Sequence, residues 1–260
     1  MARIFITGSA DGLGQLTARA LVARGHDVYL HARSAARAAE AQASCPGAKG
    51  AFVADLSSES ETRQLAVELN KNGPWDAVVH NAAVLHLRRG QGKGDIFKIN
   101  TVAPYLLTAL MDPPARRYVF ISSSMHRGGD PGLKRPGIEI SGYSDTKLQC
   151  LALTKYFARA FNVKEEGKGK GVVCECMDPG WVPTKMGGAG APDDMGKAID
   201  TYVMLAEGSG RVAGREESGG GGYWYQGRES GGYQKAADEE GVQLRLVREL
   251  ERITGVKSPV

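Results

Sequence analysis

Short apolar runs alternate with longer amphipathic stretches along most of the chain. The runs are rich in β-branched and aromatic residues and predict strands at residues 4–6, 28–30, 51–53, 75–79, 118–121, 172–177 and 223–225. Helical spacing of apolar positions predicts helices at residues 13–24, 34–43, 58–70, 99–110 and 142–160. Because the apolar runs are continuous and most are followed by a helix, they indicate a parallel sheet covered on both faces. The predicted fold class is therefore α/β, a doubly wound parallel sheet of about seven strands with helices on both faces.

The length of 260 residues suits a single domain over residues 1–260. Glycine is the compositional outlier, with 35 residues, about twice the usual share of ~7%. Ten of these glycines lie in residues 207–232, a segment that alone resembles a flexible linker. The aromatic strand inside it and the periodic apolar tail at residues 243–250 argue that the segment belongs to the fold.

Charge and cysteine content exclude several classes of protein. A net charge of +4 is too small for a dedicated nucleic-acid binder. No stretch approaches 18 apolar residues and the start lacks a signal-peptide core, so we expect a soluble cytoplasmic protein with no membrane span. Cys174 and Cys176 lie on one face of an apolar run without a second Cys/His pair at zinc spacing, so no metal site is expected.

A glycine-rich turn follows the first predicted strand and leads directly into a helix. Glycines there allow a sharp turn and let a pyrophosphate approach the helix N-terminus, where free N–H groups favour negative charge. The position of the turn predicts a dinucleotide site of Rossmann type, formed by Gly8, Ser9, Asp11, Gly12, Leu13 and Gly14.

The end of the second strand bears on the choice of cofactor. NAD enzymes need an acidic residue there for the ribose 2′-hydroxyl, but this chain has His31-Ala32-Arg33-Ser34. The guanidinium of Arg33 suits a 2′-phosphate, which predicts NADP(H). The alternative is that Arg33 is a solvated surface residue and that the site also accepts NAD(H).

Tyr143 and Lys147 stand four positions apart on a predicted helix and therefore share one face. A tyrosine phenol with its ordinary pKa of roughly 10 is a poor proton exchanger near neutrality. A neighbouring ammonium favours the phenolate, as acid/base catalysis requires. The pair is thus a candidate for general acid/base chemistry, with Tyr143 as the acid/base.

Six motifs follow in order at the ends of the predicted strands. They are Thr7-Gly8-x3-Gly12-x-Gly14, Asp55-Leu56, His80-Asn81-Ala82-Ala83, Asn100, Ser122-Ser123-Ser124 with Tyr143-x3-Lys147, and Pro179-Gly180-Trp181-Val182-Pro183-Thr184. With these motifs the chain resembles the short-chain dehydrogenase/reductase family, in its branch of about 250 residues, over nearly its whole length. His80 and Ala83 depart from the Asn and Gly that are usual in the third motif.

The resemblance implies a role for each matching residue. It places Asn100, Ser123, Tyr143 and Lys147 in the catalytic set, with Asn100 on a proton relay and Lys147 also on the nicotinamide ribose. It adds Asp55, Leu56, Asn81, Ala82, Pro179, Gly180, Val182 and Thr184 to the cofactor site. The family pattern favours Ser123 as the hydroxyl beside Tyr143, while Ser122 or Ser124 caps a turn. It also implies a substrate lid around residues 184–206.

The long loop between Ser123 and Tyr143 lies beside the predicted site and is expected to shape substrate access. His126 in this loop is a candidate base, although lining the pocket or facing solvent is the favoured interpretation. Met186 and the scarcity of charge in the lid indicate an uncharged, partly apolar substrate.

These observations predict an NADP(H)-dependent oxidoreductase that interconverts an alcohol and a ketone or aldehyde by hydride transfer. A non-catalytic dinucleotide-sensing regulator is the alternative from another class, and a sugar-nucleotide epimerase or dehydratase is a further one. Relatives often form dimers or tetramers through the helices that carry Asn100 and Tyr143, so a homo-oligomer stays open.

Overall fold

The computed structural model describes residues 1–86, 92, 94–133, 137–162, 171–215 and 218–259. The strands are β1 (Arg3–Ile6), β2 (Asp27–Ala32), β3 (Gly50–Val53), β4 (Ala77–His80), β5 (Arg117–Ile121), β6 (Val173–Asp178), β7 (Gly220–Tyr225) and β8 (Arg228–Glu229). The α-helices are α1 (Gly12–Ala23), α2 (Ala35–Ser44), α3 (Glu59–Asn72), α4 (Asp95–Phe97), α5 (Ala103–Ala109), α6 (Tyr143–Ala160), α7 (Met195–Glu207) and α8 (Glu240–Thr254). Tighter or wider turns form η1 (Lys98–Val102, a π-helix) and the 3-10 helices η2 (Ser124–Gly128), η3 (Ile138–Ile140), η4 (Gly210–Val212) and η6 (Lys235–Asp238).

All the strands form one sheet in the order β3-β2-β1-β4-β5-β6-β7-β8. Neighbours from β3 to β7 pair in parallel, and β8 pairs antiparallel to β7. The predicted doubly wound sheet is therefore confirmed, with one strand more than expected. The extra strand has two residues, too few to leave a pattern in the sequence.

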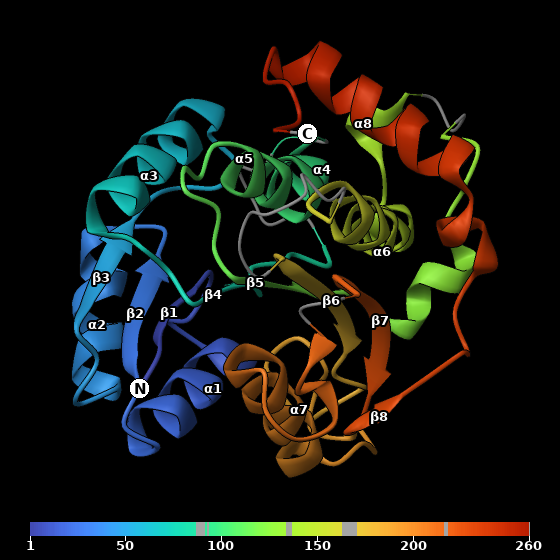
Figure 1. Ribbon diagram of the computed structural model, residues 1–260. Coiled ribbons are helices and arrows are strands. Elements are labelled where there is room, and N and C mark those ends of the chain that lie inside the picture. The colour runs from blue at the N-terminus through green and yellow to red at the C-terminus, as the bar shows by residue number, and fades with distance from the viewer. Residues whose placement is uncertain (87–91, 93, 134–136, 163–170, 216–217, 260) are drawn as a thin grey trace.

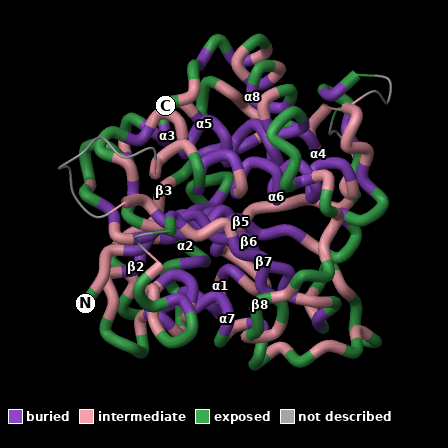
Figure 2. The backbone as a smooth tube through the Cα atoms, turned by 45° about the vertical axis from the view of Figure 1, so that its right-hand side comes forward, coloured by how far each residue is buried: buried purple, intermediate pink, exposed green. Residues whose placement is uncertain are grey.

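Helices cover the sheet on both faces (Figure 1), with α1, α2 and α7 on one side and α3, α5 and α6 on the other. Successive side chains of β1 pack on opposite faces of the sheet: Ile4 and Ile6 pack with the first set of helices and Phe5 with the second. Figure 2 shows buried positions gathered along the sheet and the inner sides of the helices. Burial on both faces explains why the strands read as continuous apolar runs.

The C-terminal helix α8 packs against α6 on the side away from the sheet (Figure 1). Its buried face carries Leu246, Val247 and Leu250. The tail beyond it is held by two tyrosines: Tyr105 of α5 donates to the carbonyl of Val256 at 2.9 Å, and Tyr156 of α6 donates to Ser258 at 3.0 Å. The periodic tail is thus part of the fold.

A buried carboxylate accounts for part of the glycine-rich segment. Glu175 of β6 is 2% exposed, and it accepts hydrogen bonds from the backbone N–H of Gly222 and from the indole of Trp224, both at 2.8 Å. Its other oxygen lies 3.1 Å from Arg215. A Cβ on Gly222 would stand 2.6 Å from that carboxylate, so β7 needs glycine there. The part of the segment that forms β7 is a strand packed on Glu175 rather than a linker.

Candidate active site

The glycine turn joins β1 to α1 at the point where the strand order reverses, between β1 and β4. Asp11 caps α1 by accepting from the N–H of Gly12 at 2.9 Å. Asn81, at the end of β4, donates to the carbonyls of Thr7 and Gly8 at 2.9 and 3.1 Å. A Cβ on Gly14 would stand 2.4 Å from the Asn81 amide nitrogen, so the close approach of β4 requires glycine at this position.

The turn has the space and the charge preference of a pyrophosphate site. Gly12 has a φ of +53°, and a Cβ built there would meet no atom within 4 Å. The backbone at the start of α1 is therefore open to a ligand, and the helix N-terminus favours an anion. In open α/β sheets such a switch point is where dinucleotides bind. The residues present thus fit the cofactor that the motif predicts.

The buried side chain of His31 is hydrogen-bonded to the backbone of the glycine turn. It is 3% exposed; its Nδ1 accepts from the N–H of Gly8 at 2.9 Å and its Nε2 donates to the carbonyl of Ala54 at 3.1 Å. Burial lowers the pKa of His31 to about 4. The imidazole is therefore neutral near pH 7 and serves as a fixed acceptor under the glycine turn.

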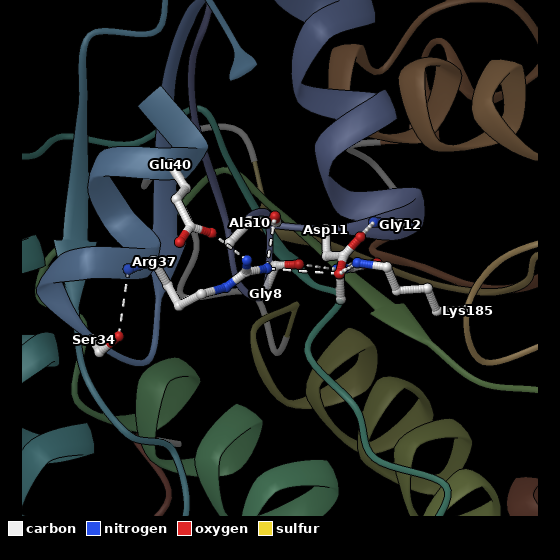
Figure 3. A network of polar contacts seen from close by, with 9 residues as sticks. Gly8, Ala10, Asp11, Gly12, Ser34, Arg37, Glu40 and Lys185 are labelled. Carbon is white, nitrogen blue, oxygen red and sulfur yellow. Dashed lines mark hydrogen bonds and ion pairs between the residues drawn. The ribbon is translucent and has the colours of Figure 1, made fainter. Parts of the chain in front are cut away.

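Three basic side chains lie around the glycine turn and the end of β2. Arg33 is exposed and forms no hydrogen bond or ion pair with the part of the chain that the structure describes. Arg37 of α2 donates to the carbonyl of Ala10 at 3.2 Å and lies 3.6 Å from Asp11. Lys185, from the loop after β6, reaches the same carboxylate at 2.6 Å and lowers the pKa of Asp11. Figure 3 shows Arg37 and Lys185 converging on Asp11 from opposite sides.

The predicted acid/base pair lies at the start of α6. Lys147 is 2% exposed, and its ammonium stands 5.3 Å from the centroid of the Tyr143 ring. The ammonium also donates to the carbonyl of Ile121, the last residue of β5, at 2.7 Å. The lysine is therefore fixed beside the tyrosine at the carboxyl end of the central strands.

The three serines after β5 have different surroundings. The hydroxyl of Ser122 is buried and donates to the carbonyl of Lys147 at 2.7 Å, so its hydrogen is already used. Ser123 is half-buried, and its oxygen accepts from the N–H of Met125 at 3.3 Å. This contact leaves the hydrogen of the Ser123 hydroxyl free to donate. Ser124 is exposed.

Asn100 lies inside the π-helix η1, which replaces the regular turn expected there. Its side chain exchanges two hydrogen bonds with the backbone of Val84, at 2.9 and 3.0 Å, and donates to Thr146 at 3.1 Å. Thr146 in turn donates to the carbonyl of Tyr143 at 2.8 Å. The amide is thus fully engaged, and it ties the end of β4 to the first turn of α6.

The remaining predicted cofactor residues occupy the same edge of the sheet. Asp55 accepts from both the N–H and the hydroxyl of Ser57, and Leu56 beside it is buried. After β6, Val182 is buried, and Thr184 accepts from the N–H of Gly187 at 3.1 Å. The other predicted members follow β1, β4 and β6 or begin α1: Gly8, Ser9, Leu13, Ala82, Pro179 and Gly180.

Comparison with known proteins identifies the family. The family model for short chain dehydrogenase matches residues 2–194. The chain belongs to the short-chain dehydrogenase family. Its relatives include short-chain dehydrogenase chyC of Penicillium rubens, 39% identical, and short-chain dehydrogenase chry4 of Gibberella zeae, 38% identical. The alignments cover all of this chain and 100% and 99% of those proteins, respectively. The protein is thus a short-chain dehydrogenase of about 260 residues, and the predicted oxidoreductase class is confirmed.

Solved structures show the same fold. The structure of an uncharacterized protein from Mycobacterium paratuberculosis superposes with a TM-score of 0.77 and 22% identity. The alignment covers all of this chain and 96% of the other. A short chain dehydrogenase from Shigella flexneri complexed with NADP covers 86% of this chain and 96% of its own, with a TM-score of 0.63 and 23% identity. Within the described ranges, no helix is long and apolar enough to cross a membrane, and no group of three His, Cys, Asp or Glu residues could hold a metal ion.

Two side chains of this region, Arg37 and Lys185, were not among the predicted site residues. Arg37 stands three positions after the helix cap Ser34, a spacing that could have indicated a second cation at the end of β2. Lys185 contacts Asp11 across 174 positions, and no local pattern indicates that contact. His126, a candidate base in the sequence, is fully buried, so the interpretation that it faces solvent is wrong.

Proposed function

We propose that this short-chain dehydrogenase interconverts an alcohol and a ketone or aldehyde with NADP(H), using Tyr143 as general acid/base. The observation that carries the proposal is the arrangement of Tyr143, the buried ammonium of Lys147 and the free hydroxyl hydrogen of Ser123 at the end of β5. When bound, the nicotinamide supplies a hydride to the carbonyl carbon in reduction or accepts one in oxidation.

The side chains act on the oxygen of the substrate. In reduction, negative charge develops on this oxygen; the Ser123 hydroxyl donates a hydrogen bond to it, and Tyr143 transfers its proton. Lys147 stabilises the phenolate that remains, because its ammonium lies beside the ring and is held by the Ile121 carbonyl. Asn100 keeps the first turn of α6 in register through Thr146. Oxidation uses the same groups in reverse.

Arg33 and Arg37 support NADP(H) over NAD(H). Both stand at the end of β2, where no acidic residue is present to bind a ribose 2′-hydroxyl. Two guanidinium groups suit the doubly charged 2′-phosphate, and Arg37 already lies against the glycine turn through the Ala10 carbonyl. The glycine turn would hold the pyrophosphate at the N-terminus of α1, and Lys147 would bind the nicotinamide ribose.

An uncharged, partly apolar substrate is proposed because large apolar side chains are exposed at the end of β7 and on the segments that follow β5 and β6. Met125, Trp181, Met186 and Tyr225 are between 38% and 60% exposed. The carboxylate nearby is already hydrogen-bonded: Asp193 accepts from the N–H of Trp181 at 2.6 Å and from Tyr225 at 3.1 Å. The segment around residues 184–206, which carries Met186 and nearly all of α7, would serve as the substrate lid.

The test is oxidation of NADPH in the presence of a panel of aliphatic and aromatic ketones and aldehydes. We expect turnover by the wild type, and loss of at least ~10³-fold in kcat for Y143F with NADPH binding retained. Y105F removes a phenolic hydroxyl remote from the site and is the matched control. Unchanged turnover by Y143F would overturn the assignment. Binding of NADPH without turnover on any carbonyl would favour the regulator instead.

A further inference from the structure

His126 connects the Ser123 loop to a distant segment of the chain. It lies in η2 and has no exposed surface. Its Nδ1 stands 2.5 Å from the carbonyl of Ser123, and its Nε2 stands 3.1 Å from the backbone nitrogen of Gln234. A carbonyl can only accept and an amide N–H can only donate, so the proton of the neutral imidazole is on Nδ1. Both ring nitrogens are therefore engaged, and burial, which lowers the pKa of His126, keeps the ring neutral.

The partner segment, residues 232–234, is bound to the second half of η2 and to Gly129 just beyond it. Arg127 donates to the carbonyl of Gly232 at 3.0 Å. The side chain of Gln234 donates to the carbonyls of Arg127 and Gly129, at 3.0 and 3.1 Å. These contacts and the imidazole form one set, which we call the η2 brace: His126, Arg127 and residues 232–234. The brace joins positions more than 100 residues apart beside the proposed catalytic serine.

The brace also continues toward the loop after β6. The ring of Tyr223 meets the His126 ring edge-on, with centroids 5.2 Å apart. Its hydroxyl donates to the buried carboxylate of Asp178 at 3.2 Å, and Asp178 accepts from the N–H of Gly180 at 2.9 Å. The imidazole thus stands between the serine loop and the turn at Pro179 and Gly180.

We propose that His126 is a positioning residue for Ser123: its Nδ1–H holds the Ser123 carbonyl, so that the neighbouring hydroxyl keeps its free hydrogen directed toward the substrate oxygen. The inference rests on the proposed reductase function. The Ser123 carbonyl also receives the backbone N–H of His126 at 2.9 Å, which makes the imidazole the second donor on that oxygen. Without it the residue loses one of two restraints, and small displacements of a catalytic group are costly to rate.

Two substitutions separate the two sides of the imidazole. The amide nitrogen of Asn takes the place of Nδ1, so H126N can still donate to the Ser123 carbonyl but offers nothing to Gln234. The amide oxygen of Gln takes the place of Nε2, so H126Q can still accept from Gln234 but leaves the Ser123 carbonyl with its backbone donor alone. Both variants lose one buried hydrogen bond, so both should melt at a lower temperature than the wild type by similar amounts.

We expect the two variants to differ in kcat. H126Q should lose about 10- to 100-fold in kcat, while H126N recovers most of that loss, and the Kd for NADPH should change less than about twofold in either. Y105F, which loses a buried hydrogen bond on the far side of α5, controls for reduced stability alone. Equal kcat in H126N and H126Q, or kcat values that follow the melting temperature across all three variants, would overturn the proposal.

A double-mutant cycle decides whether the imidazole acts through the serine. If it does, H126Q lowers kcat in the wild-type background and has no further effect in S123A. Additive losses would refute the positioning role while leaving the proposed reductase function intact. An S123A variant with unchanged kcat, or a wild type without turnover, would instead refute the proposed function. The two failures are therefore distinguishable within one set of proteins.

Discussion

Removal of the Arg37 guanidinium should weaken NADPH binding selectively. Arg37 is about one-third exposed and is held against the glycine turn by the Ala10 carbonyl, so it is preorganised for a phosphate near the end of β2. A charge-assisted contact of this kind is worth about 1.5–3 kcal/mol. Arg37 is ion-paired with Asp11 and with Glu40 of α2, and these carboxylates compete for the guanidinium, which favours a value of about 2 kcal/mol. R37A should therefore raise the Kd for NADPH about 30-fold.

Thermal unfolding with added cofactor measures this loss. At a concentration of about 100 times the wild-type Kd, NADPH stabilises the folded wild type by about 2.7 kcal/mol. The same concentration is about three times the Kd of R37A and stabilises the variant by only about 0.9 kcal/mol. Since about 1 kcal/mol corresponds to roughly 2–4 °C in a chain of this size, the shift in Tm should fall by several degrees. R33A should change in the same direction.

The controls make the result specific to the 2′-phosphate. NADH lacks that phosphate, so its Kd should be nearly equal in R37A and in the wild type. R248A removes one positive charge from the exposed side of α8 and should keep the full NADPH shift. If R33A and R37A both bind NADPH as tightly as R248A does, the proposed preference for NADP(H) is wrong.

Three further predictions concern stability and the glycine turn. Burial lowers the pKa of His80 to about 3. In the unfolded state His80 binds a proton near pH 6.5, but in the folded state it stays neutral down to about pH 3. The contribution of His80 to the free energy of unfolding is therefore complete above pH 6.5 and is lost as the pH falls. Denaturant melts between pH 6 and 4 should show a slope about 1.4 kcal/mol per pH unit shallower in H80F, and equal slopes would refute this. Glu175→Gln should cost about 3 kcal/mol of unfolding free energy, because the amide oxygen can still accept from the two N–H donors but the uncharged amide nitrogen then faces the half-buried guanidinium of Arg215. The exposed Glu229→Gln should cost below about 1 kcal/mol, and equal losses in chemical denaturation would contradict the buried-pair argument. Gly14→Ala should raise the Kd for NADPH at least about tenfold, as cofactor fluorescence can show, whereas Gly241→Ala on α8 should leave it unchanged.

Features fixed by neighbouring residues could be predicted from the sequence. The strands, the glycine turn and the helical spacing of Tyr143 and Lys147 all depend on residues within a few positions of one another. The doubly wound parallel sheet followed from the alternation of predicted strands and helices, whereas the strand order that brings Gly8 and Asn81 together is seen only in the structure. The structure confirms the predicted fold class, and the comparisons confirm the predicted family and enzyme class.

Features that depend on contacts between distant segments could not be predicted. Glu175 was read as part of an apolar run because its cation, Arg215, lies 40 positions later. The two ring nitrogens of His126 contact Ser123, which is close in sequence, and Gln234, which is more than 100 residues away. Asn100 was expected on a regular helix, and no sequence pattern predicts the π-helix η1 that contains it. The catalytic and cofactor roles of the predicted residues stay predictions.

The position of α8 bears on how copies of this chain can assemble. The family resemblance implies association through the helices that carry Asn100 and Tyr143, which here are η1 and α6. In this protein the outer side of α6 is covered by α8, and Tyr105 and Tyr156 fasten the tail that follows. Helix α8 thus occupies, within a single chain, the surface of α6 on which such an association would be built. We therefore expect any homo-oligomer of this dehydrogenase to use a different face.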